Sequence, residues 1–203
     1  MTTKLREWYR SEFRAATLAE ARDLIKEDGW EGLTLRKLAQ RMQCSPMALY
    51  TYFADKQALL TALALEGFEK LAKRHEGTSR LEPLSALRKI MLDHIAFAEE
   101  NPTEYRILFL SPQPAAGIKM TRQELGENNP AFRLLFKSVQ ACIEAGVLKG
   151  DSFAISTIVL TAAHGAASLL IAATFPFGSH RRYAEEVVAT TLSGLQNRAV
   201  RAI

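Results

Sequence analysis

The sequence predicts an all-α protein built from about nine helices. Apolar residues recur at helical spacing along most of the chain, and the apolar–polar alternation that predicts strands does not persist anywhere. Hydrophobic residues make up 48% and charged residues 24% of the chain, which is typical of a globular protein in water. We therefore expect helices packed around an apolar core, and no strands.

Composition indicates the cellular setting but not the function. Two cysteines, Cys44 and Cys142, are too few for a disulfide framework and fit a reducing compartment. The start of the chain, MTTKLREWYR, lacks the apolar segment of a signal peptide, so we expect a cytoplasmic protein. The net charge of +4 is shared equally between residues 1–56 and the remainder. Charge totals alone therefore do not single out a nucleic-acid-binding segment.

Turn residues and caps set the order of the helices. The first helix covers residues 11–28 and ends at Gly29, and the second follows Thr34, a favourable N-cap. A third, short helix begins at Pro46 after Ser45, because proline is well tolerated at the first helical position. Further helices are expected at about 56–73, 84–100, 103–110, 130–146, 152–175 and 179–201, with a long loop over 111–129.

Residues 34–53 have the layout of a helix-turn-helix. In such a unit the first helix braces the second, whose N-terminal residues lead into the major groove of DNA. Leu49 and Phe53, four residues apart, form the inward pair of the second helix. The positions then left exposed are Met47, Ala48, Thr51 and Tyr52.

The exposed residues of this second helix suit contact with a duplex. Pro46 and Met47 give an apolar tip that fits thymine methyl groups. Tyr50 and Tyr52 can pack on sugar and donate hydroxyl hydrogen bonds to phosphate or a base edge. The same helical pattern also fits three short helices of a bundle, with the aromatic residues as core filler.

Two neighbouring features predict phosphate contacts. Asp55 caps the next helix, and its free N–H groups together with Lys56 would form a phosphate clamp. Arg36, Lys37 and Arg41 lie on the polar face of the bracing helix.

The longer run EGLTLRKLAQRMQCSPMALYTYFADKQALLTALA resembles the N-terminal DNA-binding domain of the tetracycline repressor (TetR) family. The agreement extends over about residues 12–65 and is in register at Gly32-Leu33-Thr34, Arg36 to Ala39, Ser45, Leu49-Tyr50, Phe53 and Lys56-x-x-Leu59-Leu60. Members of this family are dimeric, all-helical repressors released when a small molecule binds their C-terminal domain. One departure is Gln43, which stands where the family's turn usually has Gly, so we expect a positive φ at a non-Gly residue.

The resemblance implies roles for individual residues. Groove-facing roles fall to Pro46, Met47, Ala48, Thr51 and Tyr52. Phosphate or backbone roles fall to Thr34, Arg36, Tyr50 and Lys56. Lys37 and Ser45 complete the expected DNA-binding set, and the expected partner is double-stranded operator DNA with a palindromic sequence.

Two C-terminal runs, HIAFAEENPTEYRILF (94–109) and TAAHGAASLL (161–170), resemble one subtype of the family's C-terminal domain. That subtype is marked by a Trp followed by His-Gly, and here His164-Gly165 is present without the Trp. We divide the chain into a DNA-binding domain, residues 1–56, and an effector-binding and dimerisation domain, residues 57–203.

We expect a small, apolar effector to contact a set of aromatic residues and one histidine. These residues are Phe97, Tyr105, Phe109, Phe136 and His164. All of them are also ordinary core or interface residues, and the sequence does not separate the two readings.

Residues 155–175 carry no formal charge and are about long enough to span a bilayer. They contain six Ser, Thr and His residues and lack a flanking basic cluster on one side, which favours a helix buried on two sides. We therefore predict a homodimer through residues 152–175 and 179–201, with no membrane partner.

No catalytic motif is present: Gly-x-Ser-x-Gly, Walker A, His-Glu-x-x-His and Cys-x-x-Cys are all absent. No Cys or carboxylate stands at metal-ligand spacing near His94 or His164. We therefore predict a ligand-responsive repressor that is not an enzyme and has no cofactor or metal. The alternatives are a helical protein–protein adaptor without DNA binding, an activator of the same fold, or a small helical enzyme.

Overall fold

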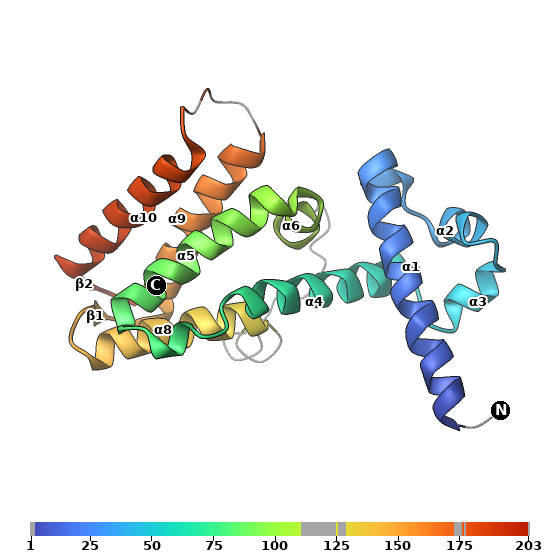
Figure 1. Ribbon diagram of the computed structural model, residues 1–203, viewed down its shortest axis with the longest axis horizontal. Helices are drawn as coiled ribbons and strands as arrows, with labels where there is room; N and C mark the ends of the chain where they lie inside the picture. The colour runs from blue at the N-terminus through green and yellow to red at the C-terminus, as the bar shows by residue number, and fades with distance from the viewer. Residues whose placement is uncertain (1–2, 111–124, 126–128, 173–175, 177, 203) are drawn as a thin grey trace. The chain divides into compact units, whose positions relative to one another are not determined.

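The computed structural model describes residues 3–110, 125, 129–172, 176 and 178–202 (Figure 1). This part of the chain contains nine α-helices, one 3-10 helix and two strands of two residues each. The predicted all-α class is confirmed.

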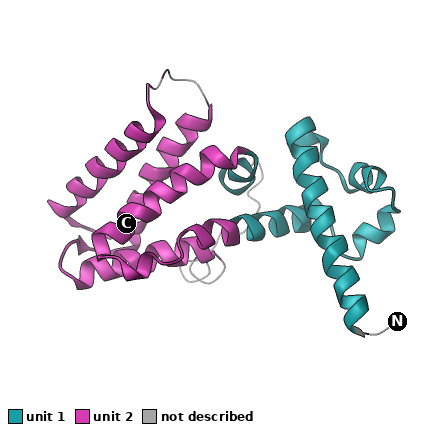
Figure 2. Ribbon diagram, viewed as in Figure 1, with its two compact units in different colours: residues 1–67, 103–118 teal, residues 68–102, 119–203 magenta. Residues whose placement is uncertain are grey.

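Two compact units divide the chain within helix α4 (Lys56–Arg74) (Figure 2). The first unit holds the residues up to Gly67 together with α6 (Pro102–Phe109) from Thr103 onward. The second holds Phe68–Pro102 and the described residues from Leu125 onward. The chain first passes from one unit to the other between Gly67 and Phe68 of α4, and the domain boundary expected at residue 56 stays a prediction.

The first unit begins with α1 (Thr3–Gly32), α2 (Leu35–Arg41) and α3 (Pro46–Tyr50). Its core consists of fully buried side chains from all three helices and the start of α4: Leu18, Ala21, Leu24, Leu38, Leu49, Phe53 and Leu59. Helix α1 starts eight residues before the predicted position, because residues 3–10 contain no helix breaker although they bury little apolar surface. Gly29, at φ 69° and ψ −171°, interrupts the helix where the sequence predicted its end.

Helix α6 packs against α4 within the first unit. A Cβ added at Gly67 would lie 2.9 Å from Cδ2 of Leu108, so a larger residue there would require the leucine side chain to shift. A residue of α6 is therefore in direct contact with α4.

The second unit is a helical bundle. Helix α5 (Pro83–Glu100) packs against α8 (Pro130–Glu144), α9 (Ser152–Ala172) and α10 (His180–Gln196), and the short 3-10 helix η1 (Thr78–Arg80) lies against α5. The centre of the bundle is fully buried and includes Leu87, Phe97, Val139, Ile155, Ala167 and Val188.

The expectation of no strands is wrong at one place. Strand β1 (Lys149–Gly150) pairs in parallel with β2 (Ala199–Val200), in the segment predicted to end the last helix. Gly150 has φ +127°, and a Cβ there would lie 2.1 Å from the carbonyl oxygen of Val200. A two-residue strand has no periodicity to detect, so the sequence pattern could not reveal this pairing.

The remaining helix ends agree with the predictions within a few residues. Helix α8 ends just before Gly146, which has φ 72°, and its N-cap Asn129 accepts a hydrogen bond from the backbone N–H of Phe132 at 2.9 Å. The predicted loop 111–129 lies outside the described residues, except for Leu125 and Asn129.

Candidate DNA-binding surface

Helix α2 is fixed at its start by the predicted cap. Thr34 has an extended backbone, and its Oγ1 accepts a hydrogen bond from the backbone N–H of Lys37 at 3.1 Å. Leu35, Leu38 and Ala39 are buried against the rest of the unit. The polar face of α2 is thereby turned outward.

The turn after α2 contains a strained residue. Gln43 has φ 52°, and it is the one non-glycine residue with a positive φ in the described part of the chain. The chain then returns through a hydrogen bond from the N–H of Cys44 to the carbonyl of Ala39, at 3.0 Å. The positive φ expected from the missing glycine is therefore confirmed.

Helix α3 is short and is held by both its cap and its buried face. Ser45 has an extended backbone, and its Oγ accepts a hydrogen bond from the N–H of Ala48 at 3.2 Å, with Pro46 in the first turn. Leu49 is 0% exposed and Phe53 is 2% exposed, as the predicted inward pair requires.

The opposite side of α3 faces solvent. Met47 is 71% exposed and Tyr50 is 51% exposed, and Pro46 is exposed beside them. Thr51 is exposed as well, and its hydroxyl donates to the carbonyl of Ala48 at 2.6 Å. A monomer leaves these large apolar and aromatic side chains in water, which is typical of a surface that binds a partner.

Tyr52 and Ala48 differ from the prediction, because both are half-buried rather than exposed. The ring centroid of Tyr52 lies 4.9 Å from that of Phe13 on α1, and the guanidinium of Arg10 lies 5.9 Å from the Tyr52 ring centroid. Sequence reasoning missed Arg10, because the predicted first helix started only at residue 11.

Most basic residues of the bracing helix are neutralised within the unit. Lys37 pairs with Asp28 at 2.7 Å, and Arg41 pairs with both Glu20 and Glu27 at 2.5 Å. The hydrogen bond from Arg41 lowers the pKa of the Glu27 carboxyl. By contrast, Arg36 is exposed and forms no ion pair with any residue that the structure describes.

The start of α4 is capped from inside the unit. Asp55 accepts a hydrogen bond from the N–H of Ala58 at 2.7 Å. The ammonium of Lys56 donates to the carbonyl of Trp30 at 2.6 Å, just before α1 ends. An ammonium has three donors, so this bond positions Lys56 and leaves donor capacity for a phosphate.

Comparison with known proteins connects this geometry to a family. The family described as "Tetracyclin repressor-like, C-terminal domain" matches residues 87–192, just over half of the 203 residues, and "Bacterial regulatory proteins, tetR family" matches residues 18–63. The chain belongs to the TetR family. Its α2–turn–α3 unit lies within the segment that matches "Bacterial regulatory proteins, tetR family".

Individual relatives match only part of the chain. The tetracycline repressor protein class G of Vibrio anguillarum is 29% identical over 126 residues, which is 60% of this chain and 55% of that protein. The nucleoid occlusion factor SlmA of Actinobacillus pleuropneumoniae serotype 5b is 35% identical over 91 residues, 42% of this chain and 43% of that protein. The chain thus spans about half the length of the curated relatives it matches.

A solved structure matches most of the chain. A protein with unknown function from Rhodococcus sp. RHA1 superposes with a TM-score of 0.74 at 24% identity, covering 90% of this chain and 95% of that one. At this identity the likeness shows the fold. A regulatory protein of the tetR family from Rhodococcus RHA1 and a TetR family transcription regulator from Marinobacter aquaeolei VT8 share it, with TM-scores of 0.65 and 0.71.

The five residues predicted to contact an effector fall in both units. Tyr105, fully buried, and Phe109 pair on α6 with ring centroids 4.8 Å apart. In the second unit Phe97 is fully buried in the bundle core, and Phe136 stacks on Phe132 at 6.4 Å.

Three histidines of the second unit lie in surroundings that favour the neutral form. Burial lowers the pKa of His75 to about 4 and that of His94 to about 3, with His164 and His75 contributing further to the shift of His94. Burial also lowers the pKa of His164, whose Nε2 lies 3.4 Å from Oγ of Ser168. Among the described residues no group of three or more His, Cys, Asp or Glu side chains could hold a metal ion.

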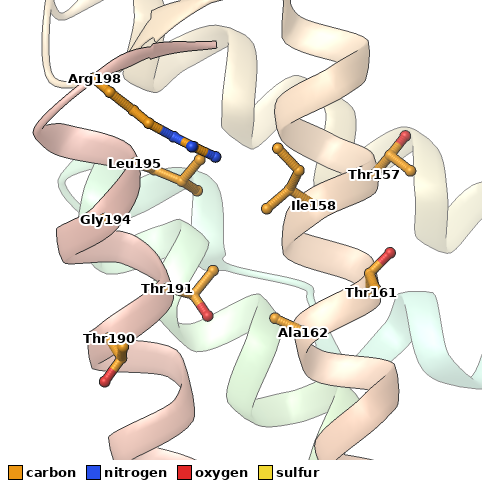
Figure 3. A pocket seen from close by; sticks show the side chains of 9 residues that line it. All are labelled: Thr157, Ile158, Thr161, Ala162, Thr190, Thr191, Gly194, Leu195 and Arg198. Atoms are coloured by element: carbon orange, nitrogen blue, oxygen red, sulfur yellow. The ribbon is translucent and has the colours of Figure 1, made fainter. Parts of the chain in front are cut away.

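A groove of about 600 Å³ lies between α9 and α10 (Figure 3). Ile158, Ala162, Thr191 and Leu195 point into it, and Arg198 reaches across its end. None of the five predicted effector contacts lines this groove. It lies on the two helices predicted to form the dimer.

By length and composition alone, helix α9 could cross a membrane. In its most apolar 18-residue stretch, 44% is buried inside the protomer, and the rest is left at least partly exposed. Its buried residues, among them Ala163, Ala166 and Ala167, face the bundle. A second stripe at helical spacing is left exposed or half-buried and consists of Ile158, Thr161, Ala162, Gly165 and Leu169.

Proposed function

We propose that this protein is a dimeric transcriptional repressor that binds a palindromic operator and is released by a small, apolar effector. The observation that carries the proposal is α3, a capped helix of five residues with Leu49 buried and Met47 and Tyr50 in solvent. Residues 1–56 bind DNA, and residues 57–203 bind the effector and dimerise. The protein acts in the cytoplasm.

In this proposal α3 enters the major groove. Pro46 and Met47 contact thymine methyl groups, while Ala48 and Thr51 lie against base edges. The hydroxyls of Tyr50 and Tyr52 bind sugar or phosphate. Ser45 caps the N-terminus of α3 and so fixes the position of the first turn of this helix at the DNA.

The flanking elements bind phosphates and fix the orientation of α3. Arg36, which lacks an intramolecular ion pair among the described residues, is the strongest candidate. Thr34 and Lys56 stand at the starts of α2 and α4, and Lys37 must exchange its bond with Asp28 for a phosphate.

Dimerisation joins α9 and α10 of two protomers into a four-helix interface. The exposed stripe of α9 and the groove beside α10 support this, because small residues such as Ala162 and Gly165 allow close helix approach. A twofold axis then sets the two recognition helices about 34 Å apart, or at a multiple of that spacing, to match a palindrome.

The effector acts by shifting the population between conformers with different recognition-helix spacing. Its contacts are Phe97, Tyr105, Phe109, Phe136 and His164. Tyr105 and Phe109 flank Leu108, which packs on Gly67 of α4, so an effector that moves α6 also moves the helix leading from the DNA-binding unit. His164-Gly165 further supports the C-terminal subtype marked by Trp and His-Gly.

The test separates a repressor from a helical adaptor. The double variant Tyr50→Ala/Lys56→Ala removes one exposed aromatic contact and one phosphate contact, so operator affinity measured by fluorescence anisotropy should fall at least about 100-fold. The dimer mass measured by light scattering should stay unchanged. Gln140→Ala, an exposed substitution on α8, is the matched control and should leave both values at wild type. Wild-type DNA affinity in the double variant would refute the assigned surface.

A further inference from the structure

Three arginines at the N-terminal end of α1 form a single stripe. Arg6, Arg10 and Arg14 follow one another at a spacing of four residues, which places them on one face of the helix. Arg6 and Arg10 are exposed and Arg14 is half-buried. The stripe lies N-terminal to residues 18–63, which match the family's DNA-binding domain.

The stripe is packed onto the helix-turn-helix. The guanidinium of Arg14 lies 5.3 Å from the ring centroid of Phe53, and that of Arg10 lies 5.9 Å from the ring centroid of Tyr52. Such cation–π contacts hold a guanidinium in place without neutralising its charge. The positive stripe is therefore continuous with the segment that directly follows α3.

These arginines, like Arg36, have no counter-charge among the described residues, whereas several other basic residues of the same unit are paired. Arg22, Lys37 and Arg41 each pair with a carboxylate. The stripe forms no ion pair with any residue in the described part of the chain, although Glu7 and Glu12 lie on the same helix. Like charges four residues apart repel one another on a helix, so a bound polyanion would relieve this repulsion.

We propose that Arg6 and Arg10 bind backbone phosphates of the duplex beside the segment read by α3, and that Arg14 is a positioning residue anchored on Phe53. The inference rests on the proposed DNA binding and extends its footprint to the N-terminal end of α1. Guanidinium groups suit phosphate because their donors match two of its oxygens. The contact is to the backbone, so it strengthens binding to every sequence alike.

The test measures affinity against salt concentration. The probe is the tightest-binding duplex recovered from a random 40-base-pair pool, titrated by fluorescence anisotropy at several salt concentrations. Arg6→Ala/Arg10→Ala removes two phosphate contacts from each protomer and therefore four from the dimer. The slope of log affinity against log salt should become shallower by about 3.6, with roughly 1,000-fold weaker binding at 0.15 M salt. The control Lys26→Ala/Lys137→Ala removes two exposed charges from other helix positions and should keep the wild-type slope.

A second variant distinguishes charge from structure. Arg6→Lys/Arg10→Lys retains both charges and should bind within about threefold of wild type, while circular dichroism confirms equal helix content in all variants. An unchanged salt slope in the alanine variant would overturn the inference. The inference would also be overturned if the Arg6→Ala/Arg10→Ala variant bound DNA normally but lost binding to vesicles of phosphatidylglycerol and phosphatidylcholine. If the wild type enriches no duplex from the pool, the proposed function fails instead.

Discussion

At the scale of single residues, His75 is the most unusual group in the second unit. Its side chain is 3% exposed, and neither ring nitrogen forms a hydrogen bond with any residue that the structure describes. Burial lowers its pKa to about 4, and the nearby charges of Lys89 and Arg74 also lower it, whereas Asp93 raises it. A buried polar group without a partner costs roughly 1–3 kcal/mol, so His75 destabilises the folded state even when neutral.

The depressed pKa of His75 predicts a dependence of stability on pH. Below pH 6.5 the unfolded chain binds a proton at this histidine while the folded chain does not, so stability falls as the pH drops towards 4. Between pH 7 and pH 5 the unfolding free energy should fall by about 2 kcal/mol because of His75, and His94 adds a loss of the same sign.

His75→Leu tests this assignment by urea unfolding at pH 7 and pH 5. Between pH 7 and pH 5 the unfolding free energy of the variant should fall less than that of the wild type, by the share assigned to His75. At pH 5 the variant should be more stable than the wild type. An undiminished pH dependence in the variant would assign the effect to His94 or to another group.

Local chemistry at the residue scale was predictable where it depends on neighbours in sequence. Thr34 and Ser45 cap their helices as expected, because a cap needs only a side-chain oxygen within three residues of a free N–H. The partners of Lys56 and Tyr52 were not predictable, since both lie on α1, far away in sequence.

At the scale of elements, the turn between α2 and α3 carries a removable strain. Gln43 adopts a left-handed conformation, which costs an L-residue roughly 1–2 kcal/mol. Glycine adopts it freely but loses more backbone entropy on folding. Gln43→Gly should therefore raise the unfolding free energy by about 0.5–1 kcal/mol, measured by urea denaturation.

A neighbouring glutamine provides the control. Gln40 is exposed within α2, where glycine destabilises the helix by about 1 kcal/mol. Gln40→Gly should thus lower stability, opposite in sign to Gln43→Gly. Equal destabilisation by both substitutions would show that the turn at residue 43 is not strained.

The order of the helices could be predicted from apolar periodicity, helix caps and glycines. Two features could not be predicted: the early start of α1 and the pairing of β1 with β2. The first turns of α1 bury little apolar surface, so residues 3–10 show no apolar stripe from which a helix could be predicted. The β1–β2 pair depends on Gly150 meeting Val200, a contact between segments far apart in sequence.

At the scale of the whole molecule, the proposed dimer explains why α9 is apolar on two sides. One side lies in the protomer core, and the other leaves Ile158, Ala162 and Leu169 at least partly in water. The sequence predicted both faces from the lack of charge over residues 155–175. It could not predict which face meets the bundle, because that depends on how α5, α8 and α10 pack.

Ala162→Arg tests this interface. A charged side chain in the groove between α9 and α10 would be buried against the partner, so the variant should be monomeric by light scattering at concentrations where the wild type is dimeric. Its affinity for a palindromic duplex should fall at least about 100-fold, because each half-site is then bound alone. Gln140→Arg on α8 adds the same charge at an exposed position and should remain dimeric. A dimeric Ala162→Arg variant would place the interface elsewhere.

The central claim is that this chain reads duplex DNA as a symmetric dimer. The most direct measurement is selection of binding sites from a random duplex pool, followed by titration of the enriched sequence at two salt concentrations. The account predicts a palindromic sequence whose half-sites are one helical turn apart, or a multiple of that, with affinity falling steeply as salt rises. A folded dimer that enriches no sequence above non-specific binding would contradict it.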